Sequence, residues 1–189
     1  MRITGGLARG IPLALPKGDA VRPATDALRQ AVFSSLAARV PGTQFLDLFA
    51  GSGAYGLEAL SRGAAGGVFV ESDARTAGFI RRNLDAVCKS LGRDAGGVHV
   101  ITADATSVKL AAAPDLVFID PPYESIRAVG PKVFARLTEL LQDKADPLIV
   151  FEMPGEIELS PADWTCVKRL GQGGRQPTAC IFRATRAAP

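Results

Sequence analysis

The chain has 189 residues, of which 47% are hydrophobic and 22% are charged, and its formal net charge is +3. This composition is typical of a globular protein and excludes a disordered or fibrous one. No uninterrupted apolar run approaches the roughly 20 residues that cross a bilayer, and the first ten residues lack the apolar centre of a signal peptide. We therefore predict one domain over residues 1–189 in a cytoplasmic protein that makes no membrane contact.

Histidine and cysteine usage excludes several classes of enzyme. His99 is the only histidine, so a Ser-His-Asp hydrolase, a Cys-His protease or a multi-histidine metal site has almost nothing to be built from. The three cysteines are odd in number and have no CxxC spacing, which indicates neither a disulfide framework nor a zinc cluster. We expect no metal cofactor.

The first 24 residues are predicted to form a β-hairpin extension ahead of a core over residues 25–189. Gly5, Gly6 and Gly10 interrupt a short run of apolar residues here. Both ends of the chain are basic and the middle is acidic. Basic ends favour contact with a polyanion, although solvated surface charge is the alternative. We therefore predict that Arg2 and Arg9 bind the substrate.

From residue 25 onward, apolar runs alternate with segments of helical length. Thr25 or Asp26 is predicted to cap the first helix. This alternation predicts a Rossmann-like α/β fold, in which helices cover both faces of a mostly parallel sheet and the C-terminal strand is antiparallel. Strands are predicted at 45–49, 67–71, 98–102, 116–119 and 148–151, helices at 55–62, 75–91 and around 132–141, and a closing hairpin within 164–183.

A glycine-rich loop is predicted between the first of these strands and its helix. Gly51, Gly53 and Gly56 satisfy the pattern GxGxxG. Such a loop lets the backbone approach a ligand closely at the carboxyl edge of the sheet. A tight turn from strand to helix also requires glycines, so the loop does not identify the ligand.

Acidic residues near this loop indicate the kind of cofactor. Glu71 ends the second strand, where a carboxylate accepts hydrogen bonds from the ribose hydroxyls of either NAD or S-adenosylmethionine. Asp47 suits an ammonium group better than a pyrophosphate. Asp104 follows the third strand and could meet an adenine amino group, although capping of a helix is the alternative. Because no lysine or arginine is expected beside these acids, they favour S-adenosylmethionine.

The sequence Asp-Pro-Pro-Tyr at 120–123 follows the fourth strand and indicates the chemistry. An amino group on a nucleic-acid base is a poor nucleophile, because its lone pair is delocalised into the ring. Asp120 could accept one of its hydrogens and the carbonyl of Pro121 the other, while the rigid prolines fix both directions. Tyr123 could stack on a flipped base. Neither a metal nor a covalent nucleophile is required.

With these residues in place, the chain resembles the bacterial 16S ribosomal RNA guanine-N2 methyltransferases of the RsmD family along nearly its whole length. The Asp-Pro-Pro-Tyr motif is shared with DNA amino-methyltransferases and therefore indicates only the reaction class. The start of the chain and the Arg-Pro segment are more specific. The matching pieces are residues 2–6 with 9–10, residues 22–26 with Arg29 and Phe33, residues 47–64, residues 69–71 and residues 120–123.

The resemblance implies a seven-stranded class I methyltransferase sheet that binds S-adenosylmethionine and releases S-adenosylhomocysteine. It implies a guanine of 16S ribosomal RNA as the target, within an assembling small subunit, and we expect a monomer. Ala24 and Gln30 depart from the family, which has threonine and glutamate there. The expected cofactor-binding residues are Arg22, Thr25, Asp47, Gly51, Ser52, Gly53, Glu71, Ser72, Asp104 and Ala105.

Three other functions stay open. An amino-methyltransferase acting on DNA shares the motif, but 189 residues leave little room for a target-recognition domain. A non-catalytic nucleotide- or RNA-binding module would also explain the basic ends. A dehydrogenase would use the same glycine loop and Glu71 to bind NAD.

Overall fold

A seven-stranded sheet forms the centre of the computed structural model, which describes residues 1–15, 25–171 and 173–185. The strand order is β3-β2-β1-β4-β5-β7-β6, in which β7 runs antiparallel to both β5 and β6. This order confirms the predicted Rossmann-like α/β fold with its antiparallel C-terminal strand. The strands are β1 (Gln44–Leu48), β2 (Gly66–Glu71), β3 (Val98–Thr102), β4 (Leu116–Ile119), β5 (Leu148–Pro154), β6 (Trp164–Leu170) and β7 (Pro177–Ala184).

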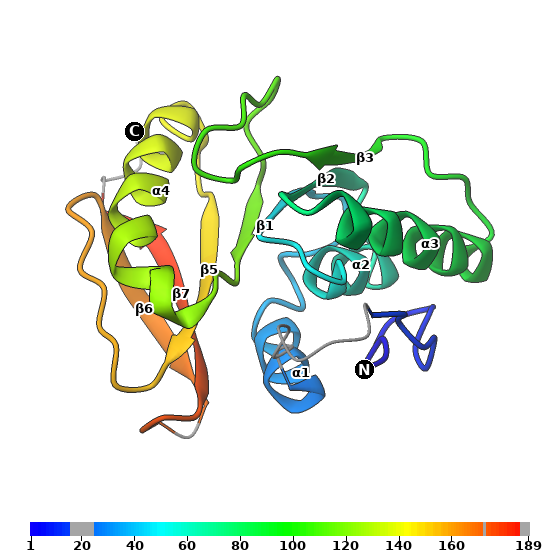
Figure 1. Cartoon of the computed structure of the whole chain (residues 1–189), viewed down its shortest axis with the longest axis horizontal. Coiled ribbons are helices and arrows are strands. Elements are labelled where there is room, and N and C mark those ends of the chain that lie inside the picture. The colour runs from blue at the N-terminus through cyan, green and yellow to red at the C-terminus, as the bar shows by residue number, and fades with distance from the viewer. Residues whose placement is uncertain (16–24, 172, 186–189) are drawn as a thin grey trace.

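Helices cover both faces of this sheet. They are α1 (Asp26–Ser35), α2 (Ala54–Ser61), α3 (Ala74–Leu91) and α4 (Ile126–Leu140), and a 3-10 turn, η1 (Tyr123–Ser125), precedes α4. Figure 1 shows α4 on one side of the central strands and α1, α2 and α3 on the other. None of the described helices has the length and apolar character that a membrane span needs. The oxygen Oγ1 of Thr25 accepts a hydrogen bond from the amide of Leu28 at 3.2 Å, so Thr25 is the predicted cap of α1.

Two apolar clusters form the core because side chains alternate between the faces of each strand. We call them the α2-side cluster and the α4-side cluster. The α2-side cluster includes Phe33, Phe45, Leu57, Phe69, Phe118 and Val150, and the α4-side cluster includes Leu46, Ile119, Phe134, Phe151 and Phe182.

The N-terminal segment, residues 1–15, doubles back into a short antiparallel hairpin, as predicted. It has one antiparallel bridge, between Arg2 and Pro12, and the Ile3 amide donates to the Ile11 carbonyl at 3.0 Å. The turn also bonds to the end of α2, where the amide of Leu7 donates to the Ser61 carbonyl at 2.8 Å. This contact with α2 was not predicted. The predicted boundary at residue 24 and Arg22 lie outside the described residues.

A buried ion pair ties this segment to two helices. Arg29 of α1 and Glu58 of α2 have fully buried side chains, and Arg29 Nε lies 3.3 Å from Glu58 Oε2. The backbone amide of Thr4 donates to Glu58 Oε2 at 2.8 Å, and its hydroxyl donates to Oε1 at 2.7 Å. Arg62 pairs with Glu58 at 2.8 Å, and Arg29 also donates to the Arg2 carbonyl at 2.5 Å. The pair thus joins α1, α2 and the N-terminal segment.

We predict that Arg29→Met lowers the free energy of unfolding by about 3–5 kcal/mol, because it removes a buried partner of the Glu58 carboxylate. The control is Arg39→Met, which breaks a partly exposed pair with Asp146 and should cost at most about 1 kcal/mol. Urea unfolding followed by circular dichroism measures both changes. Equal losses in the two variants would show that the buried pair contributes no more than a surface one.

Candidate active site

The loop between β1 and α2 has an unusual backbone. Phe49, Gly51 and Gly53 have φ angles of 58°, 54° and 78°, all in the left-handed region. Phe49 is the only non-glycine residue with positive φ in the described chain, and such strained residues cluster at functional sites. A Cβ added at Gly51 would meet only the Phe49 carbonyl oxygen, at 3.9 Å. The loop therefore has open space beside Gly51, where a ligand can approach the backbone.

The third glycine of the motif serves packing. A Cβ at Gly56 would lie 2.4 Å from Phe69 Cε1 and 2.5 Å from Phe45 Cε2. Because Gly56 has no side chain, α2 can lie directly against β1 and β2. This contact fixes the start of α2, and with it the loop.

Ser52 connects the loop to the N-terminal segment. Its side chain is buried and its hydroxyl donates to Met1 Sδ at 3.3 Å. Asn83 of α3 donates to the carbonyls of Ser52 and Ala14, both at 3.0 Å, and accepts from the Ala14 amide at 2.8 Å. Ser52 thus holds the N-terminal segment on the loop, a role that the glycine pattern did not indicate.

Glu71 lies at the loop, as the sequence predicted. Its Oε2 accepts a hydrogen bond from the Gly51 amide at 2.9 Å. Its Oε1 accepts from the Asp73 amide at 2.9 Å and from the hydroxyl of exposed Ser72 at 3.4 Å. A half-buried carboxylate at the end of β2, next to the open loop, is suited to ribose hydroxyls.

Asp104 caps a turn. Its Oδ1 accepts from the Thr106 amide at 2.7 Å and from the Thr106 hydroxyl at 2.8 Å. These bonds hold the pKa of this exposed carboxyl below its usual value. Its Oδ2 accepts no hydrogen bond from the described residues, so an acceptor remains for a ligand. Ala105, the next residue, is buried.

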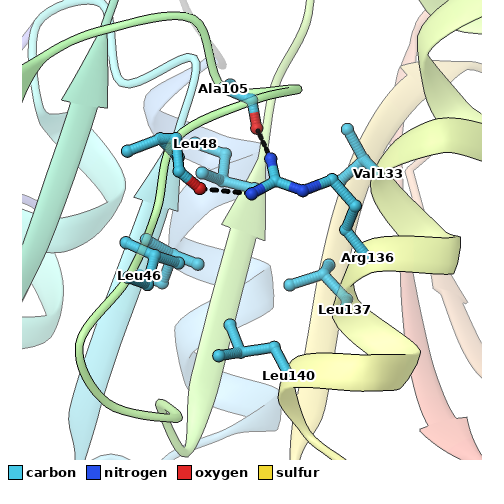
Figure 2. A pocket seen from close by; sticks show the side chains of 9 residues that line it. Leu46, Leu48, Ala105, Val133, Arg136, Leu137 and Leu140 are labelled. Carbon is cyan, nitrogen blue, oxygen red and sulfur yellow. Dashed lines mark hydrogen bonds between the residues drawn. The ribbon is translucent and has the colours of Figure 1, made fainter.

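Arg136 of α4 supports the loop that carries Asp104. No helix lies between β3 and β4 in this structure, and the guanidinium donates to the carbonyls of Ala105, at 3.3 Å, and Val108. Figure 2 shows Arg136 beside an apolar cavity lined by leucines of β1 and α4. The expectation that no cation lies near the acids is wrong for Asp104, because Arg136 and Lys132 contribute to its lowered pKa.

Asp47, the predicted partner of an ammonium group, has a structural role in the described residues. It lies within β1, only 2% exposed, and its Oδ2 accepts from the Gly56 amide at 2.9 Å. Burial raises the pKa of this carboxyl to about 8. Asp47 therefore anchors the first turn of α2, and its contact with an ammonium stays a prediction.

The Asp-Pro-Pro-Tyr motif presents two unused acceptors. Asp120 follows β4, half-buried, and burial raises its pKa well above the usual value, with further contributions from the charges of Glu152 and Asp47. Among the described residues, no hydrogen bond uses the Asp120 carboxylate or the carbonyl of buried Pro121. The next carbonyl, that of Pro122, is occupied by Ser125. Half-buried Tyr123 packs against the α4-side cluster.

Tyr55 and Glu152 join this site, and we did not predict either of them. The Tyr55 hydroxyl donates to Glu152 Oε2 at 2.8 Å, and its ring stacks on Phe118 at 5.3 Å. Glu152 is 2% exposed. A lone carboxylate within the apolar run 148–154 was the available signal for Glu152. The hydrogen bond itself joins residues 97 positions apart, so no local pattern contains it.

The predicted substrate-binding arginines lie on the N-terminal segment. Arg9 is exposed, and the side chain of Arg2 is 71% exposed and 4.0 Å from Asp26.

Within the parts of the chain that the structure describes, no three histidine, cysteine, aspartate or glutamate residues are grouped closely enough to hold a metal ion. Most of the predicted cofactor-binding residues within the described ranges lie around the β1–α2 loop and at the ends of β2 and β3. Thr25 is the exception, because it caps α1.

Comparison with known proteins adds three findings. The family described as conserved hypothetical protein 95 matches residues 1–180. Ribosomal RNA small subunit methyltransferase D of Escherichia coli is 34% identical over 173 residues, which cover 87% of this chain and 81% of that protein. A solved Escherichia coli structure named "Putative methyltransferase yhhF" is 30% identical, covers 99% of both chains and has a TM-score of 0.77.

A more distant solved structure shares the fold alone. It is named "SMU.776, a putative methyltransferase complexed with SAH", with 13% identity and a TM-score of 0.66. The match covers 83% of this chain and 49% of that one. The same fold therefore also occurs as part of a larger protein.

We predict that Gly56→Ala lowers the free energy of unfolding by about 1–3 kcal/mol, because the new methyl group overlaps the rings of Phe45 and Phe69. The control, Gly78→Ala in α3, places its methyl group in open space and should raise stability by about 0.5–1 kcal/mol. Urea unfolding distinguishes the opposite signs. A neutral Gly56→Ala would mean that α2 can move away from the sheet without loss.

Proposed function

Because the chain belongs to the family described as conserved hypothetical protein 95, and matches a ribosomal RNA small subunit methyltransferase D along most of its length, we propose that it transfers a methyl group from S-adenosylmethionine to ribosomal RNA of the small subunit. The target is the exocyclic N2 amino group of a guanine in 16S ribosomal RNA. The observation that carries this proposal is a pair of acceptors that no described residue occupies, the Asp120 carboxylate and the Pro121 carbonyl, at the same sheet edge as the glycine loop.

The residues around the loop fit S-adenosylmethionine. The open space at Gly51 admits the cofactor to the backbone, and Glu71 accepts from its ribose hydroxyls. The free oxygen of Asp104 accepts from the adenine amino group, above buried Ala105. The raised pKa values of Asp47 and Asp120 fall when a positively charged cofactor is bound nearby, because its charge favours their ionised forms. When bound, the cofactor supplies an electrophilic methyl group. Arg22, Thr25, Ser52, Gly53 and Ser72 complete the proposed cofactor contacts.

Asp120 and Pro121 prepare the target amino group. Each takes one of its two hydrogens, and this orients the nitrogen lone pair toward the methyl group in line. The fixed φ of the prolines keeps both acceptors in place without loss of entropy during the reaction. The half-exposed ring of Tyr123 lies immediately after them and stacks on the base.

The N-terminal segment contacts the RNA. Exposed Arg9 and largely exposed Arg2 lie on a segment that the Glu58 network and Ser52 hold next to the site. Phosphate contacts from such arginines position the substrate without selecting the base. An assembling small subunit as substrate and a monomeric enzyme remain parts of this proposal.

Transfer of labelled methyl groups distinguishes the proposed function from its alternatives. We expect label in isolated small subunits or in 16S ribosomal RNA that lacks the modification, with N2-methylguanine as the product. Label in DNA would favour a DNA amino-methyltransferase. Binding of RNA without transfer would indicate a non-catalytic module, and binding of NAD in place of S-adenosylmethionine a dehydrogenase.

We predict that Glu71→Ala weakens S-adenosylmethionine binding by about 1–3 kcal/mol, because the ribose loses a hydrogen-bond acceptor. Isothermal titration calorimetry measures the affinity. Glu156→Ala, in the exposed segment after β5, serves as the control and should bind normally. Normal affinity in both variants would remove Glu71 from the cofactor site.

We predict that Asp120→Ala lowers the single-turnover rate by about 100-fold or more, because the target amine loses the acceptor that orients it. The fold and most of the cofactor affinity should remain. Glu124→Ala, at an exposed position of η1, is the control and should retain the wild-type rate. A near-normal rate for Asp120→Ala would refute the role assigned to the motif.

A further inference from the structure

Asp120 and Glu152 occupy equivalent places on neighbouring strands. The last paired residues of β4 and β5 are Ile119 and Phe151. Asp120 and Glu152 are the next residues along the two strands, so the parallel register places them side by side. Neighbouring strands lie about 4.8 Å apart. By strand alternation, both residues share the face of Phe118 and Val150 in the α2-side cluster. The two acids therefore lie together beneath α2.

The groups around Glu152 come from every element packed on this face. Tyr55 of α2 donates to Glu152 Oε2 at 2.8 Å. Arg29 of α1 is the cation that favours the ionised form of Glu152, and Asp47 of β1 acts on Asp120. On β7 the residue paired with Glu152 is Ala179, which is apolar and buried. Asp120 alone of the two carboxylates has no hydrogen bond to a described residue, so it is the one free to meet a substrate.

The charges of the two acids are linked. Burial raises the pKa of Glu152 to about 7, while the Tyr55 bond and Arg29 oppose the rise. Burial and the charge of Glu152 raise the pKa of Asp120 well above its usual value. Two adjacent buried carboxyls do not both ionise near neutral pH. Near neutral pH, the pair therefore shares one proton once it carries a single negative charge.

We propose that Glu152, held by Tyr55, is a positioning residue that makes Asp120 and Glu152 a single acceptor for the proton lost by the target amino group. This inference rests on the proposed function. As the nitrogen–methyl bond forms, the methyl–sulfur bond breaks and its electron pair goes to sulfur. The nitrogen–hydrogen bond breaks, and the proton goes to the negative charge that the pair shares, so that both carboxyls end protonated. The site loses the sulfonium charge and gains a proton, so its total charge is unchanged, which is favourable at low dielectric.

The pH dependence of single-turnover methyl transfer tests the pair. In the wild type the rate should rise through about pH 7, because the acceptor must carry its negative charge. Tyr55→Phe removes a bond to the carboxylate, so the transition should move to higher pH. Glu152→Gln still accepts from Tyr55 but cannot ionise, and it removes the charge that raises the pKa of Asp120, so the transition should leave its wild-type position near pH 7 and follow Asp120 alone. In the Glu152→Gln background, Tyr55→Phe should no longer move the transition.

A second measurement needs no RNA. Calorimetry in buffers of different ionisation enthalpy counts the protons released when S-adenosylmethionine or S-adenosylhomocysteine binds. The sulfonium favours the ionised pair, so S-adenosylmethionine should release more protons near pH 7. Glu152→Gln should abolish this difference, and the exposed control Glu156→Gln should preserve it.

The outcomes separate the two proposals. If the wild type binds cofactor but methylates no ribosomal RNA, the proposed function fails, and the proton count still decides whether the pair responds to the sulfonium. If the wild type is active and Glu152→Gln matches it in rate, pH profile and proton release, the pair is refuted. Circular dichroism confirms that each variant is folded.

Discussion

The ion pair between Arg29 and Glu58 is the interaction on which the rest of the structure depends. Two charges without access to water are tolerated only where their remaining hydrogen-bonding groups are satisfied. Thr4 and Arg62 do this for Glu58, and no described buried side-chain nitrogen or oxygen lacks a partner. The pair makes α1, α2 and residues 1–15 one unit. Since α2 begins at the glycine loop, it also fixes the direction in which that loop presents its backbone.

The same guanidinium acts on the chemistry. Arg29 lowers the pKa of both Glu152 and Tyr55 and so partly offsets the burial of the acids at this edge. It does not neutralise them, because the pKa of Asp47, Asp120 and Glu152 remains raised. This edge of the sheet has more carboxyls than cations, and its cation, Arg29, is already paired with Glu58. The edge therefore complements a positively charged cofactor better than it complements a pyrophosphate. The pair that stabilises the fold therefore also contributes to the selection of the ligand.

Local patterns predicted the elements and most of the loop chemistry. The strands over 98–102 and 116–119 have the predicted bounds, because their apolar runs end at clear breaks. Glu71 lies at the glycine loop and accepts from the Gly51 amide, since consecutive parallel strands end at one edge, and its contact with a ribose stays a prediction. The N-terminal hairpin doubles back as predicted, but its contact with Ser61 of α2, more than fifty residues away, was not predicted. Apolar periodicity does not show which distant helix end a turn contacts.

The contribution of Glu152 and Tyr55 to the site around Asp120 was not predicted for a related reason. Residue types identify which atoms can accept a proton or orient an amine, and Asp120 was found that way. How acidic a group is depends on its neighbours, and the strand order supplies those neighbours. β4 and β5 are separated by α4, yet they pair, and this places Glu152 beside Asp120 and below Tyr55. The chemistry of the motif is thus set partly by Glu152, a carboxylate far beyond it in the sequence, and this becomes visible only once the sheet is assembled.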